Sequence, residues 1–380
     1  LDYGGVYPSV FDAMTSRQFL FGRANYYVND TFDIAGGVRI EREQGGVTLT
    51  PPTSQRTNTG SFVEARVSLA NRIFGTAGVG LEKNGLFGVA VVPRASLAVY
   101  ARPPPASGQG VLGETKFVVN VGRGIKAPSV FNEQSQLFKL IGDLSNGTEL
   151  IKKFKVAPIG PERSRNVDIG IEQTLAGRRI RLRASYFDNV FNDLVEYVNS
   201  GVLPHLGVPA DIAAAVPFGA TVNASSYTAR GIETSVDAYI DDFRIVGSYT
   251  RLNVEVTKSF SSGALTPAIN PTFPGIEIGQ FTPLVGARPF GRPRNMGRLM
   301  ASYIRGRGHV TFTGYFAGKS DGSTFLSDAF FGTTMLLPNR DLNDRHQKLD
   351  LSGSYRLHRS VTWYLSIENL LNQRYQATLG

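Results

Sequence analysis

The chain has 380 residues and carries 40 Lys and Arg against 31 Asp and Glu, a net charge of +9. It has 42 Gly, 24 Phe, 15 Tyr, one Trp and no Cys, a composition that suits curved sheets in an oxidising envelope compartment. No run of eighteen apolar residues occurs, which excludes a transmembrane helix, so a membrane protein with this sequence must be a β-barrel.

Segments in which every second residue is apolar recur along the chain and predict about fourteen antiparallel strands. Clear examples are 62–69, 179–187, 348–357 and 361–367. A run of ten residues spans about 23 Å at ~3.3 Å per residue and ~45° tilt, close to the apolar band of a transmembrane barrel. In 179–187 the apolar positions alternate with three basic residues that we predict to face the lumen, namely Arg179, Arg181 and Arg183. Because basic residues alternate along strands rather than gather on a helix, the net charge does not indicate nucleic-acid binding.

The predicted connections alternate between short and long, as in a barrel with short periplasmic turns and long external loops. Two connections depart from this order: 83–87 is short where a long one is due, and the proline-rich 103–113 is long where a tight one is due. Tight connections are predicted at 29–31, 71–73, 175–178, 240–242, 306–308 and 358–360, and long ones at 43–60, 124–161, 198–226, 255–295 and 318–346.

Six segments carry motifs with simple structural explanations. Glycines flanking an arginine at a strand end relieve crowding or curve the sheet, prolines at strand ends cost no ladder hydrogen bond, and asparagines cap turns. In chain order, the motif residues are Gly122, Arg123, Gly124, Ala127, Pro128 and Ser129; then Pro161 and Glu162; then 186–194; then Arg230, Gly231 and Glu233; then Arg292 and Pro293; and finally Asn369 and Asn372.

In this order the six segments resemble the barrel domain of TonB-dependent outer-membrane receptors, the active transporters of Gram-negative envelopes. The resemblance implies a 22-stranded barrel around a plug domain, with energy supplied by TonB through that plug. The chain starts at Leu1 without a secretion signal, and 377–380 do not read as a strand. We therefore expect residues 1–380 to be one partial barrel domain of about fourteen strands, cut at both ends and lacking the plug and the last strand.

The sequence offers no pattern for catalysis. His205, His309, His346 and His358 share no metal-ligand spacing, and 122–126 lacks the full glycine pattern and the Lys-Ser/Thr pair of a phosphate loop. No nucleophile elbow is present. We expect no enzyme activity, cofactor, metal centre or nucleic-acid partner.

Aromatic residues in two long connections are more numerous than solvated loops require. They could grip an amphipathic ligand or pack against each other. The candidate ligand-binding residues are Phe260, Phe273, Phe281, Phe325, Phe330 and Phe331.

We therefore predict an outer-membrane receptor of a Gram-negative bacterium, monomeric and embedded in lipid. It would import a scarce solute, such as a metal chelate, cobalamin or a glycan, by binding and gating rather than by catalysis. Two alternatives stay open: a passive porin-like barrel without a plug, and a soluble all-β binding or adhesion protein.

Overall fold

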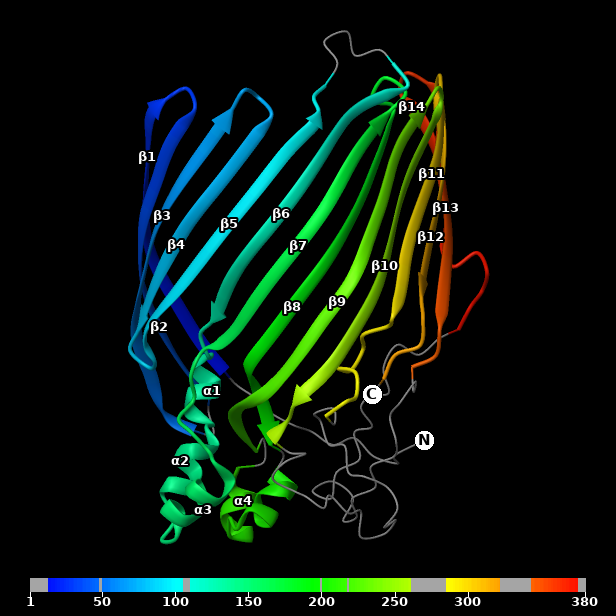
Figure 1. The fold of residues 1–380 in the computed structure, drawn as a ribbon. Helices are drawn as coiled ribbons and strands as arrows, with labels where there is room; N and C mark the ends of the chain where they lie inside the picture. Colours follow the sequence, from blue (N-terminus) through cyan, green and yellow to red (C-terminus); the bar gives the residue numbers. More distant parts are fainter. Residues whose placement is uncertain are drawn as a thin grey trace.

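The computed structural model describes residues 13–47, 50–104, 110–198, 200–216, 219–260, 285–321 and 343–374. Within these residues fourteen antiparallel strands form one curved sheet, and each strand pairs with its neighbours in chain order (Figure 1). In the described part β1 and β14 are the two edges and do not pair with each other, so the sheet is an open portion of a barrel. The predicted all-β class, strand number and incomplete closure are confirmed. The strands are β1 (Ala13–Asn29), β2 (Phe32–Val47), β3 (Thr50–Leu69), β4 (Ile73–Asn84), β5 (Gly88–Arg102), β6 (Leu112–Lys126), β7 (Glu162–Leu175), β8 (Ile180–Val198), β9 (Ala220–Ile240), β10 (Phe243–Lys258), β11 (Asn295–Arg305), β12 (Gly308–Ala317), β13 (His346–His358) and β14 (Val361–Ile367).

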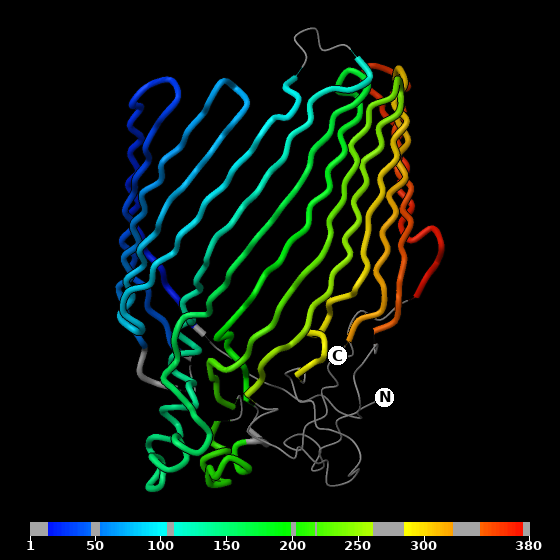
Figure 2. The backbone as a smooth tube through the Cα atoms, in the orientation of Figure 1, coloured from blue at the N-terminus to red at the C-terminus, as the bar shows by residue number. Residues whose placement is uncertain are grey.

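The two ends of the sheet differ in their connections, as Figure 2 shows. At one end, β1 joins β2 and β9 joins β10 through two-residue turns, and the same kind of turn joins β11 to β12. Left-handed backbone at Gly306 (φ 58°) and Asp241 (φ 51°) allows these tight reversals. At the other end lie the short helices α1 (Val130–Gln134), α2 (Leu137–Gly142), α3 (Gly147–Phe154), η1 (Ser200–Leu206) and α4 (Ala210–Ala215). We call these the turn end and the loop end.

The predicted long connection over 43–60 is wrong. Strands β2 and β3 continue as a paired hairpin through this segment, with Glu43 opposite Arg56 and Val47 opposite Thr50. The Gly, Pro and Thr residues of the segment suggested a loop, but a cross-strand ion pair between Glu43 and Arg56 fixes the extended ladder. Strand β9 also begins at Ala220, earlier than the predicted loop boundary at residue 226. The short link between Asn84 and Gly88 is confirmed at the loop end.

The register gives the sheet one charged face and one apolar face. Cross-strand neighbours share a face, so Glu172, Arg183 and Ser235 lie in one row, and Ile171, Ala184 and Thr234 lie in the row on the opposite face. Large apolar side chains on the second face are open, including Ile169 at 52 %, Leu299 at 53 % and Val63 at 51 % exposure. No second layer covers this face in the described residues. A soluble sheet of this size would bury such a face.

Among the described residues, no helix has the length and apolar character needed to cross a membrane.

Candidate functional site

The charged face is held by ion pairs that link neighbouring strands. Glu172 on β7 accepts a hydrogen bond from the Nε of Arg183 on β8 at 2.9 Å, and Arg181 and Lys116 lie 3.5 Å and 3.4 Å from it. The carboxylate is only 13 % exposed, while the guanidinium groups of Arg181 and Arg183 are about half exposed. Arg179 precedes β8 in the turn and lies 4.0 Å from Asp241. Arg181 and Arg183 are therefore on the charged face, and Arg179 is at the turn end.

A hollow of about 370 Å³ opens on the charged face where Gly122 stands opposite Arg94. The nearest atoms to a Cβ added at Gly122 are 3.7 Å away, so the glycine leaves space rather than relieving a clash. The hollow has both acidic and amide groups in its wall, which suits a hydrated polar solute. Its polar lining residues are Glu64, Thr76, Arg94, Ser96, Asn120, Asn166 and Asp168.

The motif at 122–129, where β6 ends, is fixed to adjacent segments by the side chains of Lys126 and Ser129. Lys126 donates to Glu162 at 2.7 Å, and the other oxygen of Glu162 accepts from the backbone N–H of Val195 at 3.0 Å, at an irregularity in the pairing of β8 with β9. Ser129 caps α1 by accepting from the N–H of Asn132. At Gly124 an added Cβ would lie 2.7 Å from the hydroxyl oxygen of Ser164. Ala127 and Pro128 connect β6 to α1, and Pro161 precedes β7.

Two further motifs, 186–194 on β8 and 230–233 on β9, contact each other directly. The ring of Phe187 lies over Gly231, where a Cβ would meet it at 2.6 Å and the carbonyl oxygen of Arg251 at 2.3 Å. Next to this contact, the Nε of Arg230 lies 2.9 Å from a carboxylate oxygen of Asp188. Glu233 stands on the charged face between Ser185 and Thr250. Glycine is thus required here chiefly by the backbone carbonyl of Arg251, and the ring of Phe187 fills the space beside it.

The last two motifs organise strand ends. Arg292 and Pro293 precede β11, whose first residue, Asn295, accepts a hydrogen bond from the hydroxyl of Tyr249 at 2.8 Å. Asn369 and Asn372 both have left-handed backbone, with φ of 52° and 47°. The side chain of Asn369 bonds to both the N–H and the carbonyl of Gln373, which confirms the predicted turn cap at Asn369. A capping role for Asn372 stays a prediction.

The helices at the loop end enclose a small hydrophobic core of their own. We use the name loop cap for the described residues of 127–161 and 200–219, together with the end of β8, the start of β9, and the end of β10 up to Phe260. Leu137, Ile141, Leu203 and Leu206 are fully buried in it. The cap therefore packs like a small soluble domain.

Phe260 is also buried in the loop cap, and its N–H donates to Glu196 at 2.7 Å. This placement agrees with mutual packing of the loop aromatics, and contact of Phe260 with a ligand stays a prediction. The other candidate ligand-binding aromatics lie outside the described residues, namely Phe273, Phe281, Phe325, Phe330 and Phe331.

One polar cluster was not foreseen from the sequence. Arg56, with a side chain only 7 % exposed, lies 2.7 Å from Glu43 and 3.3 Å from Glu133, and donates to the carbonyl of Pro128. It ties the β2–β3 hairpin to α1 of the loop cap. Arg56 falls in a segment that the composition marked as a loop, and its partner Glu133 is 77 residues away, so no local pattern points to it.

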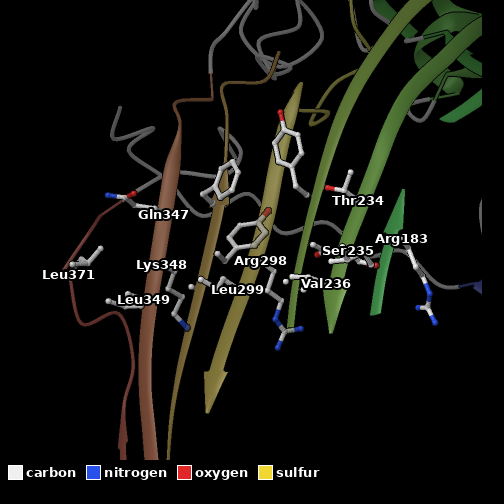
Figure 3. A pocket seen from close by; sticks show the side chains of 17 residues that line it. Arg183, Thr234, Ser235, Val236, Arg298, Leu299, Gln347, Lys348, Leu349 and Leu371 are labelled. Carbon is white, nitrogen blue, oxygen red and sulfur yellow. The ribbon is translucent and has the colours of Figure 1, made fainter. Parts of the chain in front are cut away.

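A larger hollow, of about 740 Å³, lies on the other face, along one cross-strand row over β8 to β13 (Figure 3). The hollow forms because Gly247 and Gly314 carry no side chains, which leaves space between the neighbouring leucines. It is a dip in the apolar surface rather than a polar binding site. The row contains Leu182, Val236, Gly247, Leu299, Gly314 and Leu349.

Within the described ranges, no three His, Asp or Glu residues come together in a way that could hold a metal ion.

A curved up-and-down sheet with one charged and one bare apolar face is an incomplete transmembrane β-barrel. The family model described as TonB dependent receptor-like, beta-barrel matches residues 2–370, so the chain belongs to this family. A search among curated proteins finds no match.

Solved structures share the fold at low sequence identity. The siderophore receptor PirA from Pseudomonas aeruginosa matches with a TM-score of 0.60 and 13 % identity over 95 % of this chain and 53 % of its own. The FrpB iron transporter from Neisseria meningitidis matches with a TM-score of 0.62 and 12 % identity, over 96 % and 52 %. The copper transporter OprC gives a TM-score of 0.57 and 14 % identity, over 96 % and 52 %. The chain thus spans about half the length of these proteins.

Proposed function

We propose that the complete protein carrying this chain is an outer-membrane receptor of a Gram-negative bacterium that binds a scarce solute and imports it with energy from TonB. The observation that carries this proposal is the bare apolar face that runs over the whole described sheet, opposite a face of ion-paired charges. Lipid would wet the first face, and the second would line an aqueous lumen that includes Arg181 and Arg183.

The parts of the transport cycle are assigned as follows. All of residues 1–380 would belong to the barrel, and a plug domain elsewhere in the complete protein would close the lumen and receive the pull of TonB. The loop end would face the outside, where the loop cap and the aromatics of the neighbouring connections meet the solute. Import then consists of binding and gating, with one barrel working as a monomer.

A metal chelate is the first solute class to test. The structural relatives include proteins described as siderophore receptors, an iron transporter and a copper transporter. The charged hollow beside Gly122 would offer both cationic and anionic groups to such a hydrated solute. Cobalamin and glycans are the other two classes.

The test is uptake by cells that express the complete protein and lack related receptors. We expect saturable uptake of one radiolabelled class from a panel of ferric siderophores, cobalamin and oligosaccharides, and loss of that uptake when an uncoupler removes the proton-motive force. Matched cells carrying an empty vector give the baseline. Uptake that rises linearly with solute concentration and ignores the uncoupler would identify a passive pore and contradict the proposal.

A further inference from the structure

The charged face of the sheet changes character over its last four strands. Strands β12 and β14 contain no Lys, Arg, Asp or Glu, and β11 contains no acid. In the half of these strands nearer the turn end, and in the same part of β13, hydroxyl groups take most positions on this face. We call six of these residues the hydroxyl wall: Ser302, Thr311, Thr313, Ser352, Ser354 and Ser366.

The register places the hydroxyl wall on the same face as the ion pairs. Arg183 on β8 and Arg298 on β11 lie in one cross-strand row, which runs through Ser235 and Ser248. Ser302 is four residues from Arg298 on the same strand, so its side chain is on the same face. From Ser302 the next row continues through Thr311, Ser352 and Ser366.

The hydrogen bonds of the hydroxyl wall join neutral groups. The hydroxyl oxygens of Ser302 and Thr311 lie 2.8 Å apart, and the hydroxyl oxygen of Ser354 lies 3.1 Å from Nδ1 of His309. A hydroxyl can donate one hydrogen bond and accept two, and it rotates to suit its partner. The wall is therefore able to exchange one polar partner for another at little cost.

The charges beside the hydroxyl wall are compensated by each other. Lys348 on β13 lies 3.3 Å from Asp350 on the same strand and 3.3 Å from Glu368 after β14. A solute at the wall would therefore meet hydroxyl groups first and an ion pair only at its border.

The first strands of the sheet, on the opposite side of its curve, are built differently (Figure 1). There the charged face is crossed by tight ion pairs: Asp33 lies 2.7 Å from Arg66, and Glu64 lies 2.6 Å from Arg94. The second pair reaches over Gly78 of the intervening strand. Hydrogen bonds between charged groups are about twice as strong as those between neutral groups.

A moving solute needs a wall that binds it and also releases it. Passage through a lumen requires contacts that replace lost hydration and yet are weak and repeated along the way. Hydroxyl groups meet both requirements, whereas groups held in ion pairs must first be separated. The charged hollow beside Gly122 therefore suits a solute that is held, and the hydroxyl wall suits a solute that is passing.

We propose that the solute crosses the lumen along the hydroxyl wall, and that the solute surface facing this wall is uncharged and rich in hydroxyl, carbonyl or amide oxygens. This inference rests on the proposed function, because it needs a solute that is imported. The rival occupant is a part of the complete protein that stays against the wall throughout transport, and the experiment below separates the two.

The first experiment measures when the hydroxyl wall becomes accessible. The chain has no cysteine, so Ser352→Cys introduces a single thiol into it, and Ser185→Cys on the charged face of β8 is the matched control. Cells expressing the complete protein receive a mixture of ferric siderophores, cobalamin and oligosaccharides, followed by a maleimide coupled to an uncharged polyol. We expect labelling at Ser352→Cys to be about tenfold faster with a proton-motive force than with an uncoupler, and labelling at Ser185→Cys to be unchanged. The protein without either substitution gives the background.

The second experiment tests the hydroxyl groups themselves. Ser352 and Ser366 are exposed and stand directly opposite each other. The double variant Ser352→Ala/Ser366→Ala should lower the maximal uptake rate about tenfold and leave binding of the solute at the cell surface unchanged. Ser164→Ala/Ser185→Ala removes two hydroxyl groups from the charged face of β7 and β8 and should keep the uptake rate.

Three outcomes would overturn the inference. An equal rise in labelling at both cysteine positions, or a rise at Ser185→Cys alone, shows that the solute does not follow this wall. Labelling at Ser352→Cys that ignores the uncoupler, in cells with energy-dependent uptake, assigns the wall to a fixed part of the complete protein. An unchanged uptake rate in the Ser352→Ala/Ser366→Ala variant shows that the hydroxyl groups take no part.

Failure of this inference is distinguishable from failure of the proposed function. Uptake by the protein without substitutions is read separately, with and without the uncoupler. Energy-dependent uptake without a difference in labelling would remove only the path along the hydroxyl wall. Absence of energy-dependent uptake would remove the proposed function, and the path with it.

Discussion

The sheet and the loop cap are stabilised in opposite ways, although they belong to one chain. Side chains such as Leu299 and Ile169 in the sheet are half exposed, and the strands are held by the hydrogen-bond ladder and by ion pairs on the charged face. In the loop cap, Leu137 and Leu203 are fully buried by other protein groups. The sheet therefore depends on a surrounding apolar solvent, and the cap carries its own core.

The stability of the sheet therefore depends mainly on the register of its strands, and the stability of the cap depends mainly on the volume of its buried side chains. A shift of one residue in β8 would send Arg181 and Arg183 to the apolar face. In the cap, a change of one methylene group alters a closely packed interior. Substitutions should therefore act through different physical causes in the two regions.

The largest effect is expected at the joint between the regions. Replacing Arg56 by Leu leaves Glu43 and Glu133 facing each other without a cation, so we expect the hairpin end and α1 to be destabilised by about 3–5 kcal/mol. Hydrogen exchange followed by mass spectrometry would show faster exchange in 43–60 and 127–135. The exposed counterpart Arg94→Leu, which breaks the pair with Glu64, should cost less than about 1 kcal/mol.

A triple variant sharpens this test. Arg56→Leu combined with Glu43→Gln and Glu133→Gln removes all three charges and should recover most of the lost protection, because no isolated charge is left enclosed. If the triple variant exchanges as fast as the single one, the lost protection does not come from the broken ion pairs. It then comes from the lost packing of the Arg56 side chain.

The next effect concerns the face that meets lipid. Ala184→Arg and Leu351→Arg each place a cation on the apolar face, and we expect a loss of about 2–4 kcal/mol near the bilayer midplane. The matched change on the opposite face, Arg183→Leu, should be tolerated because Glu172 keeps Lys116 and Arg181 as partners. Urea unfolding of the complete protein in lipid vesicles measures both. Equal losses for the two kinds of variant would reverse the assignment of the faces.

The third effect is confined to the loop cap. Leu137→Ala removes a fully buried side chain and should lower the local stability of the cap by about 2–3 kcal/mol, since a small cap can partly collapse into the space. Exchange in 137–154 should quicken while exchange in β7, and in the part of β8 that lies outside the cap, stays unchanged. Lys139→Ala, on the exposed side of the same helix, is the control. Equal loss of protection in the sheet would mean that cap and sheet unfold together.

The sequence was a good guide to the sheet because a strand repeats its pattern every second residue. The alternation in 179–187 predicted the faces of Arg181 and Arg183, and the tight turns followed from the ends of the apolar runs. The same local logic predicted the turn cap at Asn369. Each of these features is determined by residues that are neighbours in the chain or in the ladder.

The parts that were missed depend on distant residues. The hairpin over 43–60 is rich in Gly, Pro and Thr, and its extension is secured by Arg56 contacting Glu133 across 77 positions. The contact of Phe187 with Gly231 likewise joins two motifs that are separate in the sequence. A single sequence gives no indication of such pairings, because the composition of each partner is ordinary in its own segment.

The smallest effect is expected in a third region, the turn after β14, which has neither a core nor a large lipid contact. Asn369 holds a left-handed backbone at φ 52° and closes the turn onto Gln373 through both ends of its amide, while its own N–H donates to Asp350. Asn369→Ala removes the side-chain bonds and keeps the strained φ, so we expect a local loss of about 1 kcal/mol. Asn369→Gly relieves the strain and should cost less. Exchange of the Gln373 amide measures both, and an Ala variant that is no worse than the Gly variant would show that backbone strain contributes nothing there.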